Sequence, residues 1–176
     1  MIQVIDNCLS KDDFVRIYDT LTSQEFPWFY LNNKVGDQYG HDHIHNSQFT
    51  HMFYSEFKPK SNYAVIIEPI LEVLNPKAIV KIKSNMTMPT SLGHVVFPMH
   101  VDVEKFDGGT TAIYYVNTNN GYTEFENGER VDSVENRLVI FDATMKHTGT
   151  TSTDTKFRSV ITVSYTHLTL PTKRIV

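Results

Sequence analysis

The chain is a mildly acidic sequence of 176 residues, of which 40% are hydrophobic and 12% aromatic. This length and composition fit one globular domain with a sizeable core. With a net charge of -4 the chain has no excess of basic residues, so we expect no nucleic-acid partner. Cys8 is the only cysteine, which excludes an intrachain disulfide and favours a reducing compartment. Asp6 stands where a signal peptide needs an apolar run, and no stretch reaches membrane-spanning length, so we expect a soluble cytoplasmic protein without a membrane partner.

The first predicted element is a helix that begins after Ser10. Ser10 is a capping residue with Asp13 three positions later, as in a capping box. Apolar residues follow at helical spacing, namely Phe14, Ile17, Tyr18 and Leu21. This stripe is expected to pack on one sheet of a β-rich domain.

A second helix is expected to end at Asn75-Pro76, with Pro69 either in its first turn or at a kink. Between the helices, residues 32–57 are polar and contain two glycines, which predicts a long loop near the mouth of a site. Residues 1–79 are therefore expected to form a helical support and a loop.

This loop contains a cluster of histidines, His41, His43 and His45, with His51 nearby. Three histidines at alternate positions would bind a metal if the segment were a strand. No apolar strand pattern surrounds them, however, and His-rich loops are often simply solvated. We favour a surface or substrate-facing loop and keep the metal site as the alternative.

From Met86 onward the sequence predicts short strands separated by turns. Asn127-Gly128 is a hairpin signal, because both residues tolerate positive φ. The expected strands are rich in β-branched and aromatic residues: 93–103, 110–117, 122–125, 137–141 and 157–163. Strands at this spacing indicate a mainly β sandwich or barrel and not a parallel sheet with crossover helices.

The strongest chemical signal is the triplet His100-Val-Asp102, with His147 further along. On a β-strand, residues i and i+2 point to the same face, so an imidazole and a carboxylate can meet at one point. A histidine from a distant strand would complete a two-His-one-carboxylate face, the ligand set of non-haem iron(II) oxygenases.

Arg158 lies eleven positions beyond His147, in a predicted strand where Arg158, Val160 and Thr162 share a face. A guanidinium can grip a carboxylate through two parallel hydrogen bonds. On the interior face of a barrel it needs an anionic partner, and a bound dicarboxylate would be one. An arginine on an edge strand facing water remains the alternative.

In order and spacing, the residues from Asp102 through Ala112–Asn117, Gly121–Phe125 and Asn136–Asp142 to His147 and Arg158 resemble iron(II)- and 2-oxoglutarate-dependent oxygenases. The resemblance is to the prolyl-hydroxylase-like group found in many phages and bacteria. It implies a double-stranded β-helix, or jelly roll, over residues 80–163 with helices before it. It also implies that His100, Asp102 and His147 hold a catalytic iron, that Arg158 binds the distal carboxylate of 2-oxoglutarate, and that Thr123 touches that co-substrate.

The implied activity is hydroxylation of a C–H bond with dioxygen and 2-oxoglutarate, releasing succinate and carbon dioxide, with ascorbate as a further candidate cofactor. Prolyl hydroxylases usually have Lys at the position of Arg158, and Tyr122 occupies the position of their Glu. The substrate is therefore expected to be a peptidyl side chain or a small metabolite. A cupin-like binding or structural barrel without oxidation is the alternative, and the oligomeric state stays open.

The C-terminal residues 163–172 read Val-Ser-Tyr-Thr-His-Leu-Thr-Leu-Pro-Thr, which resembles a translated transposase adapter from sequencing libraries. We therefore expect one domain over residues 1–163 and a non-native tail over 164–176. On this interpretation His167 is no ligand candidate.

Overall fold

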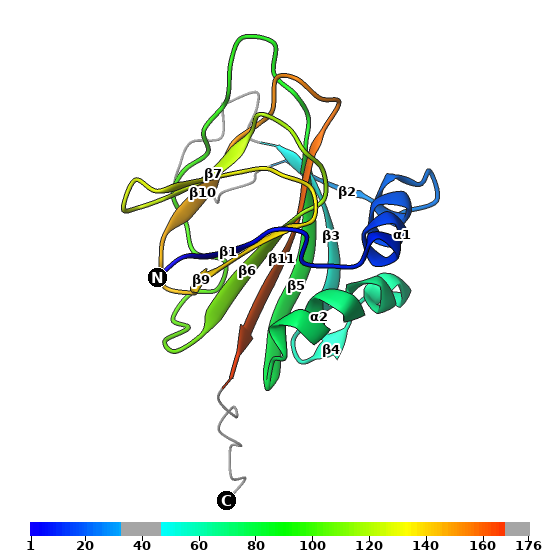
Figure 1. The fold of residues 1–176 in the computed structure, drawn as a ribbon, viewed down its shortest axis with the longest axis vertical. Coiled ribbons are helices and arrows are strands. Elements are labelled where there is room, and N and C mark those ends of the chain that lie inside the picture. Colours follow the sequence, from blue (N-terminus) through cyan, green and yellow to red (C-terminus); the bar gives the residue numbers. More distant parts are fainter. Residues whose placement is uncertain (33–46, 168–176) are drawn as a thin grey trace, which may run out of the picture.

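The computed structural model describes residues 1–32 and 47–167. In this part of the chain, two antiparallel sheets face each other (Figure 1). The larger has the strand order β1-β9-β6-β11-β5-β3-β2, with β4 paired to β3, and the smaller has the order β10-β7-β8. The strands are β1 (Gln3–Ile5), β2 (Phe29–Leu31), β3 (Gln48–Ser55), β4 (Lys58–Pro59), β5 (Ala78–Thr87), β6 (Thr110–Tyr115), β7 (Tyr122–Phe125), β8 (Arg130–Asp132), β9 (Arg137–Asp142), β10 (His147–Gly149) and β11 (Arg158–Thr166).

The helices are α1 (Lys11–Thr22), the 3-10 helix η2 (Asn62–Ile67) and α2 (Glu68–Leu74). The predicted cap of α1 is confirmed, because Ser10 Oγ accepts a hydrogen bond from the Asp13 backbone N–H at 3.2 Å. Pro69 lies in the first turn of α2, and Asn75 ends that helix with φ 45°, a left-handed conformation that asparagine tolerates. Among the described residues, no helix is both long and apolar enough to cross a membrane.

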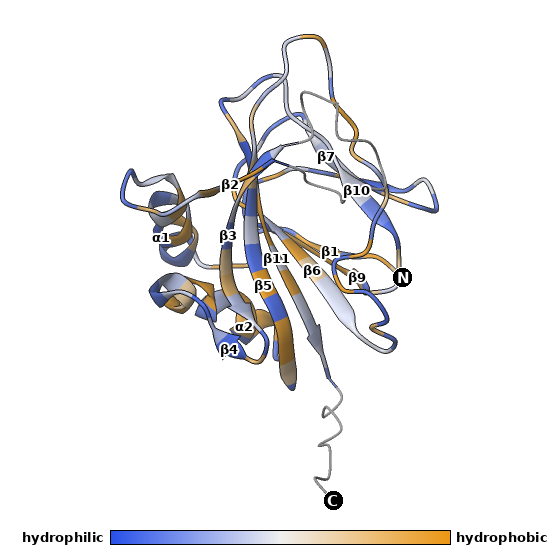
Figure 2. Cartoon of the chain, turned by 180° about the vertical axis from the view of Figure 1, so that it is seen from behind, coloured by the Kyte–Doolittle hydropathy of each residue, from blue (hydrophilic) through white to orange (hydrophobic). Residues whose placement is uncertain are grey.

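The helices pack on the outer face of the large sheet, where the main hydrophobic core lies (Figures 1 and 2). From α1, Ile17 and Leu21 are fully buried there, as their helical spacing predicts. The sheet supplies the opposite wall of this core through Ile82, Ala112, Tyr114, Leu138, Ile161, Val163 and Tyr165.

A second, smaller core lies between the two sheets. Because side chains alternate along a strand, Tyr114 of β6 belongs to the outer core and Tyr115 to the inner one. The inner core also contains Ile113, Phe125, Val131, Val139, Phe141 and Val160. This apolar layer frames the space in which the predicted site residues lie.

The expected loop over 32–57 is wrong for its last part, because Gln48–Ser55 forms β3 within the large sheet. Polar residues at buried positions of β3 hid it from the sequence pattern. His51 is buried there, with its Nδ1 2.8 Å from the Pro27 carbonyl and its Nε2 2.8 Å from Ser61 Oγ. His51 is therefore held by structural hydrogen bonds. The other loop histidines, His41, His43 and His45, lie outside the described residues.

The expected strand over 93–103 is also wrong. This segment forms no regular strand. Its β-sheet pairing is limited to two isolated bridges, Val96 with Thr150 and His100 with His147. Pro98 has no backbone N–H and cannot extend a ladder. His100 and Asp102 therefore do not owe their positions to one regular strand.

The last strand, β11, continues past its expected end to Thr166. Ser164, Tyr165 and Thr166 are buried, and they pair with β5, with Ser164 and Tyr165 also paired to β6. These residues complete the large sheet whatever their origin. The domain boundary at residue 163 and the adapter origin of the tail stay predictions.

Candidate functional site

A cavity lies between the two sheets, beside the irregular segment that contains His100. Both sheets and this segment contribute to its wall, which consists of Asn85, Thr87, His100, Asp102, Ile113, Thr123, His147, Gly149, Arg158, Val160 and Thr162. All five site residues predicted from the sequence line this cavity. The fold thus brings these five side chains together, although His100 and Arg158 lie 58 residues apart in the chain.

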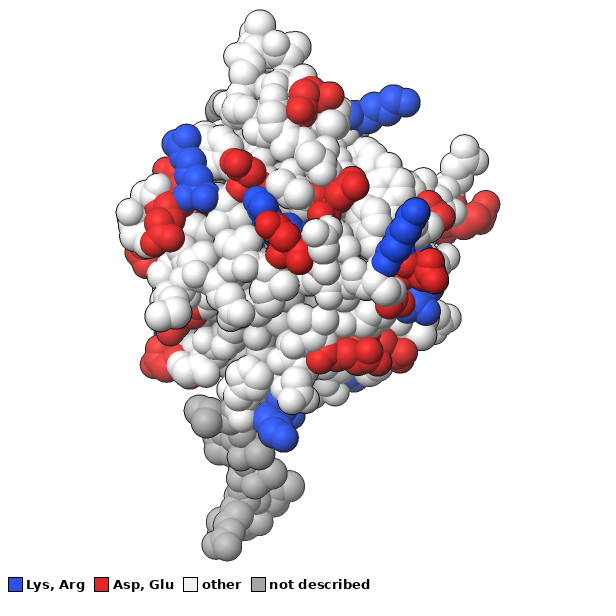
Figure 3. Space-filling view, viewed as in Figure 1, with Lys and Arg blue, Asp and Glu red and all other residues white. Residues whose placement is uncertain are grey.

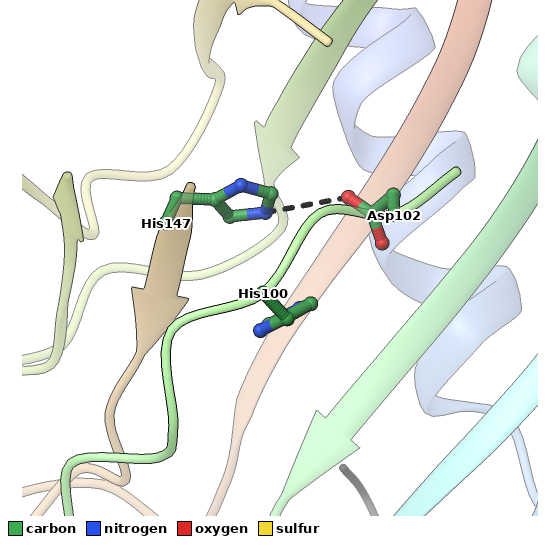
Figure 4. Close-up of side chains that lie close together, drawn as sticks. All are labelled: His100, Asp102 and His147. Atoms are coloured by element: carbon green, nitrogen blue, oxygen red, sulfur yellow. Dashed lines mark ion pairs between the residues drawn. The ribbon is translucent and has the colours of Figure 1, made fainter. Parts of the chain in front are cut away.

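The predicted metal ligands meet at one end of the cavity. His147 begins β10, and its backbone exchanges two hydrogen bonds with His100, at 2.9 and 3.0 Å. This bridge fixes the two imidazoles beside each other, and the chain then bends at Asp102. The ligand atoms of the three side chains lie within 4.8 Å of one another (Figure 4).

The hydrogen bonds around the triad leave its inward atoms available for a metal. His100 Nδ1 lies 3.1 Å from the Pro98 carbonyl, and His147 Nδ1 lies 3.4 Å from the Met145 carbonyl. An imidazole that donates from Nδ1 presents a lone pair on Nε2, the arrangement common in metal-bound histidines.

Asp102 supplies the anionic ligand atom. Its buried Oδ2 faces His147 Nε2 at 3.3 Å, the ion-pair contact drawn in Figure 4, and has no further partner among the described residues. A buried carboxylate oxygen with so few partners is stabilised by a cation that binds between it and the imidazoles. Two histidines and one carboxylate therefore fit an iron(II) ion by ligand type as well as by position.

Lys83 of β5 is a partner of the triad that sequence reasoning missed. Its Nζ lies 2.9 Å from Asp102 Oδ1, and the two side chains are 17% and 3% exposed. Burial alone would raise the pKa of Asp102, but Lys83 and His147 outweigh it and hold that pKa well below its usual value. Burial lowers the pKa of His100 to about 4, so this imidazole is neutral near pH 7.

Arg158 lies at the other end of the cavity and is 4% exposed. It donates from Nε to Ser133 Oγ at 2.8 Å and from Nη2 to Thr123 Oγ1 at 3.2 Å. Tyr115 lies under the guanidinium and donates its own hydroxyl to Thr123 Oγ1 at 2.8 Å. Arg158 is buried and β11 lies between β6 and β5, so the alternative of an arginine on an edge strand facing water is wrong. Among the described residues, no carboxylate lies within ion-pair distance of Arg158, so this part of the chain gives its charge no anionic partner.

Two glycines make room for this guanidinium. A Cβ on Gly121 would stand 2.7 Å from Arg158 Cδ, and one on Gly149 would stand 3.1 Å from Arg158 Nη1. Any other residue at Gly121 would force the arginine to shift. From the sequence, Gly121 is known only as the first residue of the segment 121–125 that resembles the oxygenases, since its contact with Arg158 depends on the fold.

Charges on the face of the molecule seen in Figure 3 are mixed, with acidic and basic side chains interspersed. That face has no continuous basic patch of the kind that tracks a nucleic-acid backbone.

Comparison with known proteins gives a match at the level of structure. No family model matches the chain, and no curated protein matches it by sequence. The structure is similar to a 2OG-Fe(II) oxygenase family protein from Burkholderia pseudomallei, with a TM-score of 0.64 and 9% identity over 98% of this chain and 88% of that one. It is also similar to a Trichoplax adhaerens prolyl hydroxylase in complex with a hypoxia inducible factor peptide fragment, with a TM-score of 0.64 and 14% identity over 94% and 83%.

A Pseudomonas putida prolyl-4-hydroxylase matches with a TM-score of 0.56 and 11% identity, over 94% of this chain and 92% of that one. These likenesses confirm the fold that the resemblance predicted: the chain has the jelly-roll fold of the 2-oxoglutarate-dependent oxygenases. At these identities, function rests on the residues of the cavity.

Proposed function

We propose that the protein is an iron(II)- and 2-oxoglutarate-dependent dioxygenase that hydroxylates a C–H bond of a peptidyl side chain or a small metabolite. The reaction consumes dioxygen and 2-oxoglutarate and releases succinate and carbon dioxide, with one oxygen atom entering the product and the other entering succinate. One observation carries the proposal: a two-His-one-carboxylate cluster faces the same cavity as a buried arginine that has no anionic partner among the described residues.

His100, Asp102 and His147 would hold the iron. When bound, the iron supplies dioxygen activation coupled to decarboxylation of the co-substrate, chemistry that no side chain provides. Asp102 contributes the negative charge, and the two imidazoles are oriented by backbone carbonyls. The chain thus presents a fixed set of ligands before the metal arrives.

Arg158 would bind the distal carboxylate of 2-oxoglutarate and fix the direction of the molecule in the cavity. Its two hydrogen-bonded neighbours in the described part of the chain, Ser133 and Thr123, are neutral, so an incoming carboxylate would supply the anionic partner that these residues do not. Ile113 and Val160 line the cavity between its two ends and keep that part of it apolar. An apolar wall strengthens the ion pair and excludes water from the reacting atoms.

A peptide substrate is supported by the Trichoplax adhaerens neighbour, which binds a peptide fragment on the same fold. A small metabolite is the second candidate, because the arginine at the co-substrate position differs from the lysine that the prolyl hydroxylases usually have. No surface observation in the described residues favours a nucleic acid.

Turnover tests the proposal. Purified protein with iron(II), 2-oxoglutarate and dioxygen is screened against pools of peptides and metabolites for succinate release, and hits are analysed by mass spectrometry for the gain of one oxygen atom. Stimulated succinate release matched by an oxidised product is expected. Binding of metal and 2-oxoglutarate without decarboxylation under any condition would instead support a cupin-like binding protein.

A further inference from the structure

Strand β5 places two lysines beside the metal end of the cavity. Lys83 and Asn85 share one face of this strand, and Asn85 lines the cavity. Lys83 is in register with Thr162 of β11, which lines the cavity as well. Lys81 lies one step further along the same face, and its Nζ donates to the Asp102 backbone carbonyl at 3.5 Å. Figure 2 shows blue, hydrophilic bands between orange, hydrophobic ones along β5.

Among the described residues, one carboxylate, that of Asp102, lies close to these two lysines. Lys83 pairs with Asp102, and among the described residues neither lysine has another acidic partner within ion-pair distance. Lys83 is 17% exposed at its side chain, so water screens its charge only in part. A cation in such a position needs an anion nearby.

Binding of the metal and of 2-oxoglutarate changes the net charge at the metal end of the cavity. Without metal, Lys83 and Asp102 neutralise each other. A divalent metal adds two positive charges, and the dicarboxylate adds two negative charges, one of which Arg158 neutralises at the far end. One positive charge is therefore left over at the metal end, and Lys81 adds a second beside it.

We propose, building on the proposed function, that the substrate carries a carboxylate group and that Lys83, assisted by Lys81, binds it next to the metal. A carboxylate would neutralise the charge that the loaded site leaves over and would replace Asp102 as the partner of Lys83. The lysines thereby select acidic peptides or acidic metabolites over neutral ones of the same shape.

Binding to a loaded but inactive site tests this selection. The protein is saturated with Mn(II) and N-oxalylglycine, a dicarboxylate that cannot be decarboxylated, and is then titrated calorimetrically with two probes of the same shape. One probe is N-acetyl-aspartic acid N-methylamide and the other is its asparagine counterpart, so the pair differs in side-chain charge alone. A charged hydrogen-bond partner should make the acid bind about 10- to 100-fold more tightly than the amide.

Variants identify the source of the preference. Lys83→Met keeps the length of the side chain and removes its charge, so the ratio of the two affinities should fall to near one. Lys81→Met should reduce the ratio by a smaller factor, and Lys83→Arg should retain most of it. Lys58→Met, at an exposed position in β4, is the matched control and should leave the ratio unchanged. Because both probes meet the same loaded protein, a loss of metal affinity in a variant cancels from the ratio.

Equal affinity for the acid and the amide in the unmodified protein, or no measurable binding of either, would overturn the carboxylate proposal. The same holds if Lys83→Met weakens Mn(II) binding and leaves the ratio intact, since Lys83 would then only position Asp102. Failure of Mn(II) and N-oxalylglycine to bind in the first place would contradict the proposed function itself.

Discussion

The two ends of the cavity hold buried charge in opposite ways. At the metal end, Asp102 has a cationic partner, Lys83, at 2.9 Å. At the other end, the hydrogen-bond partners of the Arg158 side chain within residues 1–32 and 47–167 are the hydroxyls of Ser133 and Thr123. At the metal end the carboxylate is paired with a lysine and the ligands are held in advance, whereas at the other end the described residues supply no anion. Changes at the two ends should therefore affect different ligands, the metal in one case and the dicarboxylate in the other.

The largest effect is expected from Asp102→Ala, which removes the only anionic ligand of the triad. The variant should lose stoichiometric iron(II), measured by metal analysis after removal of unbound metal. It also leaves Lys83 buried without a partner, which is expected to lower the free energy of unfolding by about 3 kcal/mol or more. Asp102→Asn preserves the shape and controls for packing.

The histidine cluster of the loop gives the matching comparison. The triple variant His41→Ala, His43→Ala and His45→Ala should retain its iron. If this variant loses the metal while Asp102→Ala keeps it, the metal site is assigned to the wrong residues.

Arg158→Ala should act at the other end of the cavity. Removing one member of a buried charge pair costs about 2 to 5 kcal/mol, which raises the apparent constant for 2-oxoglutarate about 30- to several-thousand-fold. Iron affinity without co-substrate should stay nearly unchanged. Arg158→Lys keeps the positive charge but loses the two parallel hydrogen bonds of the guanidinium, so its effect should be smaller. Negligible effects from both variants would show that the dicarboxylate binds elsewhere.

A fall in pH should lower the free energy of unfolding of the metal-free protein, because His100 at the metal end of the cavity has a depressed pKa. The pKa of His100 is lowered from 6.5 to about 4, mainly by burial, so the unfolded chain binds more protons than the folded one between these values. Stability should therefore fall as the pH drops through this window, by up to about 1.4 kcal/mol per pH unit. Arg158 does not titrate in this range.

Denaturant titrations of metal-free protein at several pH values measure this slope. The depressed pKa of Asp102 acts below about pH 5, so its contribution overlaps only the acid end of this window. His100→Gln should flatten the dependence. An unchanged slope in this variant would assign the acid sensitivity to another group.

The smallest effect is expected from Thr123→Val, which removes the acceptor shared by Tyr115 and Arg158. Two buried donors lose a partner, at a cost of about 1 to 2 kcal/mol. The apparent constant for 2-oxoglutarate should rise by about tenfold, measured by succinate release at saturating iron. Thr123→Ser retains the hydroxyl and should remain close to the original protein.

The sequence predicts two kinds of element correctly. Apolar residues at helical spacing predict the helix after Ser10. A high content of β-branched and aromatic residues predicts strands β6, β9 and β11, of which β6 and β11 are buried on both faces. Strand β3 was missed because His51 occupies a buried position, where its two ring nitrogens find partners on distant segments. Such compensation depends on tertiary contacts and leaves no local pattern.

The triad was identifiable from motif and order, although the reason given for its geometry was wrong. His100 and Asp102 are positioned by a bridge to His147 and a following bend, not by strand alternation. Lys83 could not be paired with Asp102 in advance, because their contact depends on how the irregular segment lies over β5. The spacing of Lys81, Lys83 and Asn85 does show in the sequence as a polar stripe on one strand face, and that stripe was the available signal.

The central claim is that one cavity binds a metal and 2-oxoglutarate together, and an anaerobic titration tests it most directly. Iron(II) is added to the protein with and without 2-oxoglutarate, and visible absorption is recorded for the unmodified chain, Asp102→Ala and Arg158→Ala. A charge-transfer band should appear only when both ligands are present, vanish in Asp102→Ala and require much more 2-oxoglutarate in Arg158→Ala. Stoichiometric iron binding with no band at any 2-oxoglutarate concentration would contradict the account.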